Sequence, residues 1–170
     1  MKWQCHYNKR KQNKHIVMNS YWETYSCETI ELKSSVQVYN HLFLGNEKFC
    51  SIRYGGGTRH GNVHAHWCGA NTEVDFDADL RPCKIRYFFQ HSVNIGNGFS
   101  PHVFAAVNWS KRYPGQHSFM DPITVWKEKN FELPGSASFI PVQRLHSKFA
   151  KAAIGSNQLV VSPIPAKVYV

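Results

Sequence analysis

The sequence lacks long apolar runs and is poor in acidic residues. No apolar stretch approaches the roughly 20 residues that a membrane-spanning helix needs, and residues 1–15 are basic and polar where a signal peptide would have an apolar centre. We therefore expect a nuclear or cytoplasmic chain with no membrane partner. Only 11 Asp and Glu oppose 20 Lys and Arg, which leaves a formal net charge of +9. Polyanions are the natural partners of so basic a chain.

The five cysteines lack the pattern of a disulfide framework. Their number is odd, their spacing is wide and irregular, and no CxxC pair occurs. We therefore expect reduced thiols. The three consecutive glycines at 55–57 lack the Lys-Ser/Thr pair that completes a P-loop, so we interpret them as a flexible hairpin tip.

The sequence has the size and apolar content of one folded domain. It has 170 residues, of which 42% are hydrophobic and 14% aromatic, enough for a core. We expect a basic flexible arm at 1–15, an N-terminal extension at 16–35, a barrel-like domain at 36–153 and an extended C-terminal tail at 154–170. The arm carries five cations and no acid, and an anionic partner would order it.

Strand signals dominate the middle of the chain. Segments rich in β-branched and aromatic residues, each bounded by Gly, Pro, Asn or Asp, lie at 62–68, 84–93, 102–109, 123–127 and 138–142. Such segments at short intervals predict a mainly β fold, a single antiparallel barrel-like or sandwich domain. Apolar residues at spacings of three and four, ended by Gly155, predict one short C-terminal helix at 142–153.

Two local patterns are especially clear. Gly45-Asn46 between two strand-like runs predicts a hairpin turn. Residues 103–109 place Val103, Ala105, Val107 and Trp109 on one strand face and Phe104 and Ala106 on the other, which predicts a central strand with both faces partly apolar. Trp109 and Trp126 both fall within strand patterns, so we expect them in the core.

One strand carries possible metal ligands. His64, His66 and Cys68 would project from one strand face, and imidazole and thiolate are good zinc ligands. Donors about 7 Å apart on one strand cannot converge on one ion unless the strand bulges. Cys83 or His91 would have to complete the site. We therefore favour a solvent-facing histidine strand and expect no metal and no cofactor.

Basic residues interleaved with aromatic ones suggest nucleic-acid binding, since cations neutralise phosphates and aromatic rings stack on bases. Arg59 follows the three glycines, and the Lys111-Arg112-Tyr113 run follows a strand, where we expect exposure. The candidate contacts are Lys9, Arg10, Lys11, Lys14, Arg59, Lys84, Arg86, Lys111, Arg112 and Tyr113.

Residues 79–150 also carry short motifs with a family resemblance. These include Leu80-Arg81-Pro82, the run at 85–89 and the run at 138–145. They resemble a group of uncharacterised proteins that recur in invertebrate genomes in association with mobile elements. More remotely, a strand ending in Trp109, a variable loop and a closing Pro141-Val142 segment are similar to the bromo-adjacent homology (BAH) domain. That resemblance implies a β-barrel scaffold for chromatin or protein interaction without catalysis.

Together these patterns predict a non-catalytic module that binds nucleic acid or chromatin, and the first resemblance implies that it belongs to a mobile-element-derived protein. Two alternatives stay open at this point. One is a BAH-like protein-interaction module without nucleic-acid binding, and the other is a small metal-dependent enzyme built on the histidine strand. The salt dependence of binding distinguishes nucleic-acid binding from protein interaction. The metal content of the purified protein tests the enzyme alternative.

Overall fold

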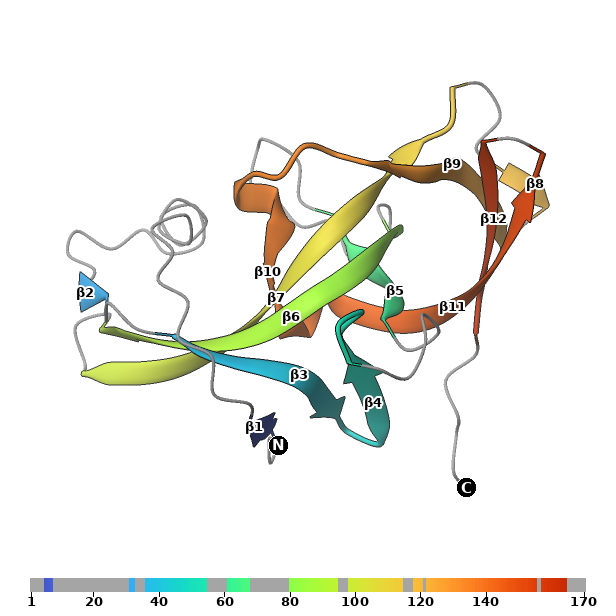
Figure 1. Ribbon diagram of the computed structural model, residues 1–170. Coiled ribbons are helices and arrows are strands. Elements are labelled where there is room, and N and C mark those ends of the chain that lie inside the picture. Colours follow the sequence, from blue (N-terminus) through green and yellow to red (C-terminus); the bar gives the residue numbers. More distant parts are fainter. Residues whose placement is uncertain are drawn as a thin grey trace.

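The computed structural model describes residues 36–54, 61–67, 80–94, 98–114, 118–120, 122–155 and 157–164, together with two short strands at 5–7 and 31–32. These residues are mainly β (Figure 1). Their helical segments are two 3₁₀ turns, η2 (Ser136–Ser138) and η3 (Val142–Arg144). No helix in the described part of the chain is long and apolar enough to cross a membrane.

Within the described residues, twelve strands form one antiparallel sheet. In chain order they are β1 (Cys5–Tyr7), β2 (Glu31–Leu32), β3 (Gln37–Leu44), β4 (Glu47–Cys50), β5 (Asn62–His66), β6 (Leu80–Asn94), β7 (Phe99–Arg112), β8 (Ser118–Met120), β9 (Ile123–Phe131), β10 (Phe139–Pro141), β11 (Leu145–Ile154) and β12 (Gln158–Pro163). β1 lies in the segment predicted as the basic arm and pairs with β3, and β2 lies in the predicted extension and pairs with β6.

The strand pairings close on themselves. Their order is β1-β3-β6-β5-β11-β12-β9-β7-β10, and β6 also pairs with β7. A path from β6 through β5, β11, β12, β9 and β7 therefore returns to β6, and we call these strands the six-strand circuit. Figure 1 shows β9, β12 and β11 as an arch beside the long β6–β7 pair.

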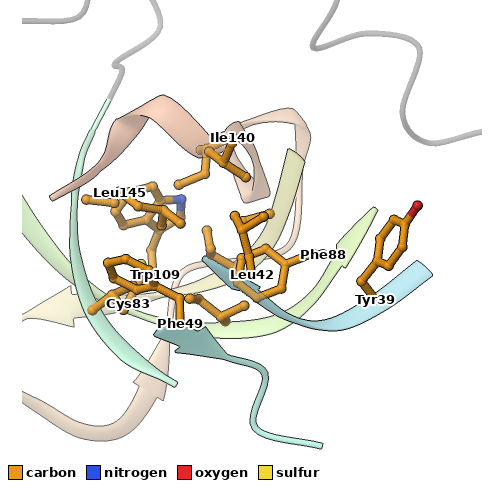
Figure 2. Close-up of a cluster of buried hydrophobic side chains, with 14 residues drawn as sticks. Tyr39, Leu42, Phe49, Cys83, Phe88, Trp109, Ile140 and Leu145 are labelled. Atoms are coloured by element: carbon orange, nitrogen blue, oxygen red, sulfur yellow. The ribbon is translucent and has the colours of Figure 1, made fainter. Parts of the chain in front are cut away.

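The main core lies on one face of β5, β6 and β7 (Figure 2). Its side chains come from seven strands and η3, so it joins the middle of the chain to the segment after β9. The buried members are Tyr39, Leu42, Phe49, Val63, Ala65, Cys83, Ile85, Phe88, Ala105, Val107, Trp109, Ile140, Val142 and Leu145. Burial raises the pKa of the Cys83 thiol well above its ordinary value.

The predicted alternation along β7 is confirmed. Ala105, Val107 and Trp109 lie in the main core, while Phe104 and Ala106 join a second cluster on the opposite face with Tyr87 and Phe89. β7 pairs with β6, β9 and β10, so it is central, as its two apolar faces predicted. The hairpin at Gly45-Asn46 is also confirmed, with Gly45 at a φ of 58°, a backbone conformation that glycine adopts without steric cost.

Trp109 and Trp126 are buried as predicted, with 2% and 6% of their surface exposed. The Trp109 indole N–H donates to the Ala137 carbonyl at 2.6 Å. Trp126 donates to the Thr124 hydroxyl at 2.8 Å and packs in a third cluster with Phe149, Leu159 and Val161.

The predicted helix at 142–153 is wrong. Val142–Arg144 form the single turn η3, and Leu145–Ile154 form β11, which pairs with β5 on one side and β12 on the other. The apolar spacing of three from Val142 to Leu145 belongs to the 3₁₀ turn. Beyond it, Ser147 and Phe149 are buried in alternation with the more exposed His146 and Lys148, which is the period of a strand.

Part of the predicted C-terminal tail is a strand within the sheet. Residues Leu159 to Val161 of β12 pair with both β11 and β9. Pro163 ends β12 and pairs with β11 opposite Phe149, where its missing N–H removes no bond from the doubly paired part.

Candidate nucleic-acid interface

The six-strand circuit has a second face, opposite the main core. Paired residues in an antiparallel sheet project to the same side, so Lys84 shares a face with Asn62 and Asn108, its partners on β5 and β7. The neighbouring residues Cys83 and Ile85 lie in the main core. Lys84 therefore points to the other side of the sheet.

This second face continues around the circuit. Along β11 it carries Phe149 and Lys151. Lys151 pairs with Val161 of β12, and Val161 belongs to the same cluster as Phe149, so these residues share one face. Leu159 of β12 pairs in turn with Trp126 of β9. We call this side the circuit face, and it carries both apolar and charged side chains.

The positive charges of two lysines from other strands act on Lys84. Lys84 comes from β6, Lys129 from β9 and Lys151 from β11, and we call them the lysine group. Burial lowers the pKa of Lys84, and the positive charges of Lys151 and Lys129 lower it further, while Glu128 acts in the opposite direction. The Lys84 Nζ lies 4.8 Å from the centroid of the Phe131 ring, within the range of a cation–π contact.

The lysine group has an excess of positive charge. Lys129 Nζ lies 3.7 Å from a Glu128 carboxylate oxygen, and 84% of the Lys129 side chain is exposed. One acid therefore faces three cations whose mutual repulsion is felt at Lys84. A bound anion would relieve this repulsion, because an opposite charge within a few ångströms favours the protonated form of a lysine. The arrangement suits a phosphate.

Arg86 stands farther along β6, where the sheet is irregular. The pairing of β6 with β7 shifts between Ile85 and Tyr87, so Arg86 is the extra residue of a bulge. Its guanidinium carbon lies 5.9 Å from the centroid of the Tyr87 ring. Burial raises the pKa of Tyr87, and the charges of Arg86 and Arg53 act against this increase, which places both arginines near the tyrosine.

A small, mainly apolar pocket opens beside Arg86. Its wall comes from β6, β7 and the segment between β9 and β10, and it includes Arg86, Tyr87, Ala106, Pro134, Gly135 and Phe139. Ser138, also in the wall, accepts a hydrogen bond from the Gly135 N–H at 3.2 Å. We call this cavity the arginine pocket.

The candidate contacts named from the sequence are only partly brought together. Lys84 and Arg86 lie on one strand and are half-buried, and Arg112 is exposed at the end of β7 beside the half-buried Lys111 and Tyr113. The arm residues Lys9, Arg10, Lys11 and Lys14, and also Arg59, lie outside the described residues.

The predicted solvent-facing histidine strand is wrong. His64 and His66 of β5 are 6% and 7% exposed, because β11 and β6 pair with β5 on both sides. The His64 ring lies 5.0 Å from Phe149, and the His66 ring lies 5.7 Å from His146. Burial lowers the pKa of His64 to about 4, with a further decrease from His146.

Possible metal ligands are not gathered in the described part of the chain. No three His, Cys, Asp or Glu side chains there are placed to hold a metal ion. Cys68, the third predicted ligand, lies outside the described residues. Cys50 and Cys83 are free, buried thiols.

The candidate contacts named from the sequence did not include Lys129, Lys151 or Arg53. Lys151 was assigned to a helix, and only the pairing of β11 with β12 places it on the circuit face. Arg53 follows β4, and its place near β6 depends on a long-range hydrogen bond from the Ile52 N–H to the Ile85 carbonyl at 2.8 Å. The sequence would have indicated Lys151 only if residues 145–154 had been predicted as a strand.

The described fold defines an antiparallel, mainly β protein. Comparison with protein-family models, curated proteins and solved structures finds no significant match to this chain. The resemblances to mobile-element-associated proteins and to the BAH domain therefore stay predictions.

Proposed function

We propose that this chain is a non-catalytic nucleic-acid-binding module whose six-strand circuit is barrel-like. The observation that carries the proposal is the lysine group, in which Lys84 lies beside the Phe131 ring and the charges of Lys129 and Lys151 act on it. Lysines that neutralise phosphates, next to aromatic side chains, are the usual components of a surface that binds single- or double-stranded nucleic acid.

The overall charge supports the same proposal. The chain has a net charge of +9, and residues 1–15 supply five cations without an acid. An arm of this composition adds phosphate contacts without sequence specificity. The lysine group would position the nucleic acid on the folded domain, and the arm would increase the affinity and the rate of association.

The direct test is binding of the purified chain to duplex DNA and to single-stranded DNA and RNA over a salt series, measured by fluorescence anisotropy. We expect affinity to fall steeply with salt, by about 0.9 log units per phosphate contact and decade of salt for duplex DNA and about 0.7 for single strands. A salt-independent affinity for a histone peptide with no affinity for nucleic acid would instead support the BAH-like alternative.

Matched double variants locate the contact. Lys129→Gln with Lys151→Gln removes two exposed charges of the lysine group. The control, Lys48→Gln with Arg144→Gln, removes the same charge from β4 and η3, which lie outside the circuit. We expect only the first pair to reduce the duplex salt slope, by up to about 1.8. Equal effects of the two pairs would contradict a localised site.

The arm is tested separately, without removing β1. Replacement of Lys9, Arg10, Lys11 and Lys14 by Gln leaves Cys5–Tyr7 unchanged. We expect the duplex salt slope to decrease by up to about 3.6. An unchanged slope would assign all phosphate contacts to the folded domain.

A further inference from the structure

The arginine pocket combines two features in one wall. Its wall is mainly apolar and includes the rings of Tyr87 and Phe139, while Arg86 stands in the same wall. Arg53 directly follows Ile52, whose N–H donates to the Ile85 carbonyl of β6 at 2.8 Å, and its positive charge acts on Tyr87. Such a cavity suits a flat apolar group that is attached to an anion.

The pocket is continuous with the lysine group along two segments. On β6, Lys84 and Arg86 are two residues apart, about 7 Å in an extended strand. Phe131, the last residue of β9, contacts Lys84. Pro134 and Gly135, which follow β9, line the pocket. One ligand can therefore contact both places.

We propose that the arginine pocket receives one base of a single-stranded nucleic acid, with the adjoining phosphate bound by Arg53 and Arg86. This inference rests on the proposed nucleic-acid binding and specifies that the nucleic acid is single-stranded. The remaining phosphates follow β6 toward the lysine group. The site is non-specific for phosphate but selective for an unpaired base.

The physical argument for a single strand is the accessibility of the base. A base in a duplex is stacked and paired, and its removal costs a few kcal/mol, whereas an unpaired base enters an apolar pocket and stacks on aromatic side chains. The pocket is unsuited to a cationic side chain, because Arg86 and Arg53 would repel it. Duplex DNA can still bind through its phosphates.

The test compares a single-stranded oligonucleotide with an abasic strand of equal length, which keeps the phosphates and lacks the bases. We expect the wild-type chain to bind the strand with bases roughly 10-fold more tightly, since base stacking on a protein surface is worth about 5- to 150-fold per base. Both strands should show the same salt slope.

A variant in the pocket wall sharpens the test. Gly135 lines the cavity in an extended conformation with φ −158°, and an added Cβ there meets no atom within 4 Å. Gly135→Leu should abolish the preference for bases and leave binding of the abasic strand unchanged. The control Ala150→Leu adds the same side chain to an exposed position of β11 and should keep the preference.

A second variant keeps the test valid if Gly135→Leu does not fold. Phe139→Leu removes a ring from the pocket wall and keeps an apolar side chain against Phe89, so it should reduce the preference for bases while the chain still unfolds cooperatively. Equal binding of the two strands by wild-type protein, with a normal salt slope, would overturn the pocket and leave the proposed function intact. No binding of any strand would overturn both. Tight binding of a mononucleotide with no preference between strands would assign the site to free nucleotides and also overturn the inference.

Discussion

The two faces of the β5–β6 pair carry different kinds of side chain. On one face, Val63, Cys83 and Ile85 are fully buried in the main core with apolar neighbours. On the other, His64 and Lys84 lie beside Phe149 and Phe131. Because successive residues of a strand alternate between faces, a single segment can supply stability and a charged surface at once.

The comparison also shows which of the two faces carries a side chain that costs stability. The main core contains no ionisable group that is charged at neutral pH, and its thiol is held protonated by burial. The circuit face keeps a partly desolvated lysine next to two other lysines, an arrangement that costs free energy without a bound anion. A face that is optimised for folding alone would not retain this group.

The largest expected effect is on the main core. Trp109→Ala should lower the free energy of unfolding by about 3–5 kcal/mol, because it removes a fully buried ring, the hydrogen bond to Ala137 and the edge contact with Trp67, whose ring centroid lies 4.9 Å away. Urea unfolding measures the loss. Leu133→Ala, at a side chain that is 86% exposed, is the control and should change stability by less than about 0.5 kcal/mol.

Trp126→Ala tests whether the third cluster, on the circuit face, contributes as much to the free energy of unfolding as the main core. Trp126 packs with only Phe149, Leu159 and Val161 among buried residues, so its loss should fall near the lower end of the range for tryptophan, about 3 kcal/mol. A loss greater than that of Trp109→Ala would show that the circuit face, and not the main core, dominates stability. Retention of the fold with loss of nucleic-acid binding would make Trp126 a stacking residue.

A pH effect should arise from His64, which is buried on the circuit face. The pKa of His64 is lowered to about 4 in the folded chain, while an unfolded histidine has a pKa of about 6.5. The unfolded state therefore binds a proton first as the pH falls, and stability decreases between about pH 6.5 and pH 4, by about 3 kcal/mol in total. Below pH 4 this contribution levels off.

His64→Phe should remove this pH dependence, because phenylalanine does not titrate and the neighbouring Phe149 ring accepts an aromatic partner. The control His146→Gln removes the weaker, charge-based cause of the shift and keeps most of the dependence. Thermal unfolding across pH 4 to 7 distinguishes the two variants. Identical pH profiles for wild type and His64→Phe would refute the assignment.

The smallest effects come from adjacent residues on β6. Cys83→Ser places a hydroxyl in the main core and should cost about 1–3 kcal/mol. Lys84→Met keeps the contact with Phe131 and removes a desolvated charge, so it should leave stability within about 0.5 kcal/mol or raise it slightly. Urea midpoints of the two variants give the comparison, and a larger loss for Lys84→Met would reverse it.

The sequence predicted elements whose pattern depends on neighbours along the chain. The alternation of Ala105, Ala106 and Val107 revealed both faces of β7, and Gly45-Asn46 revealed the turn between β3 and β4. These features need no knowledge of distant residues, because strand alternation and turn chemistry are local properties of the backbone.

Features that depend on distant pairing were not predictable. In β11, Leu145 and Phe149 are four residues apart, as on a helix face, and only the pairing with β5 and β12 makes the segment a strand. The same pairing buries His64, which alternation alone could not distinguish from a solvent-facing residue. Lys84 and Arg86 were identified by composition, but their partners Lys151 and Arg53 come from segments 67 and 33 residues away in the sequence.

The last strand on the path through the sheet bears on self-association. β10 has only three residues, ends in Pro141 and pairs with β7 alone. A short edge strand with a proline offers few unpaired N–H and C=O groups to another chain. This end of the sheet is therefore a poor template for edge-to-edge aggregation, a property that the proposed binding to a polyanion at high local concentration would require.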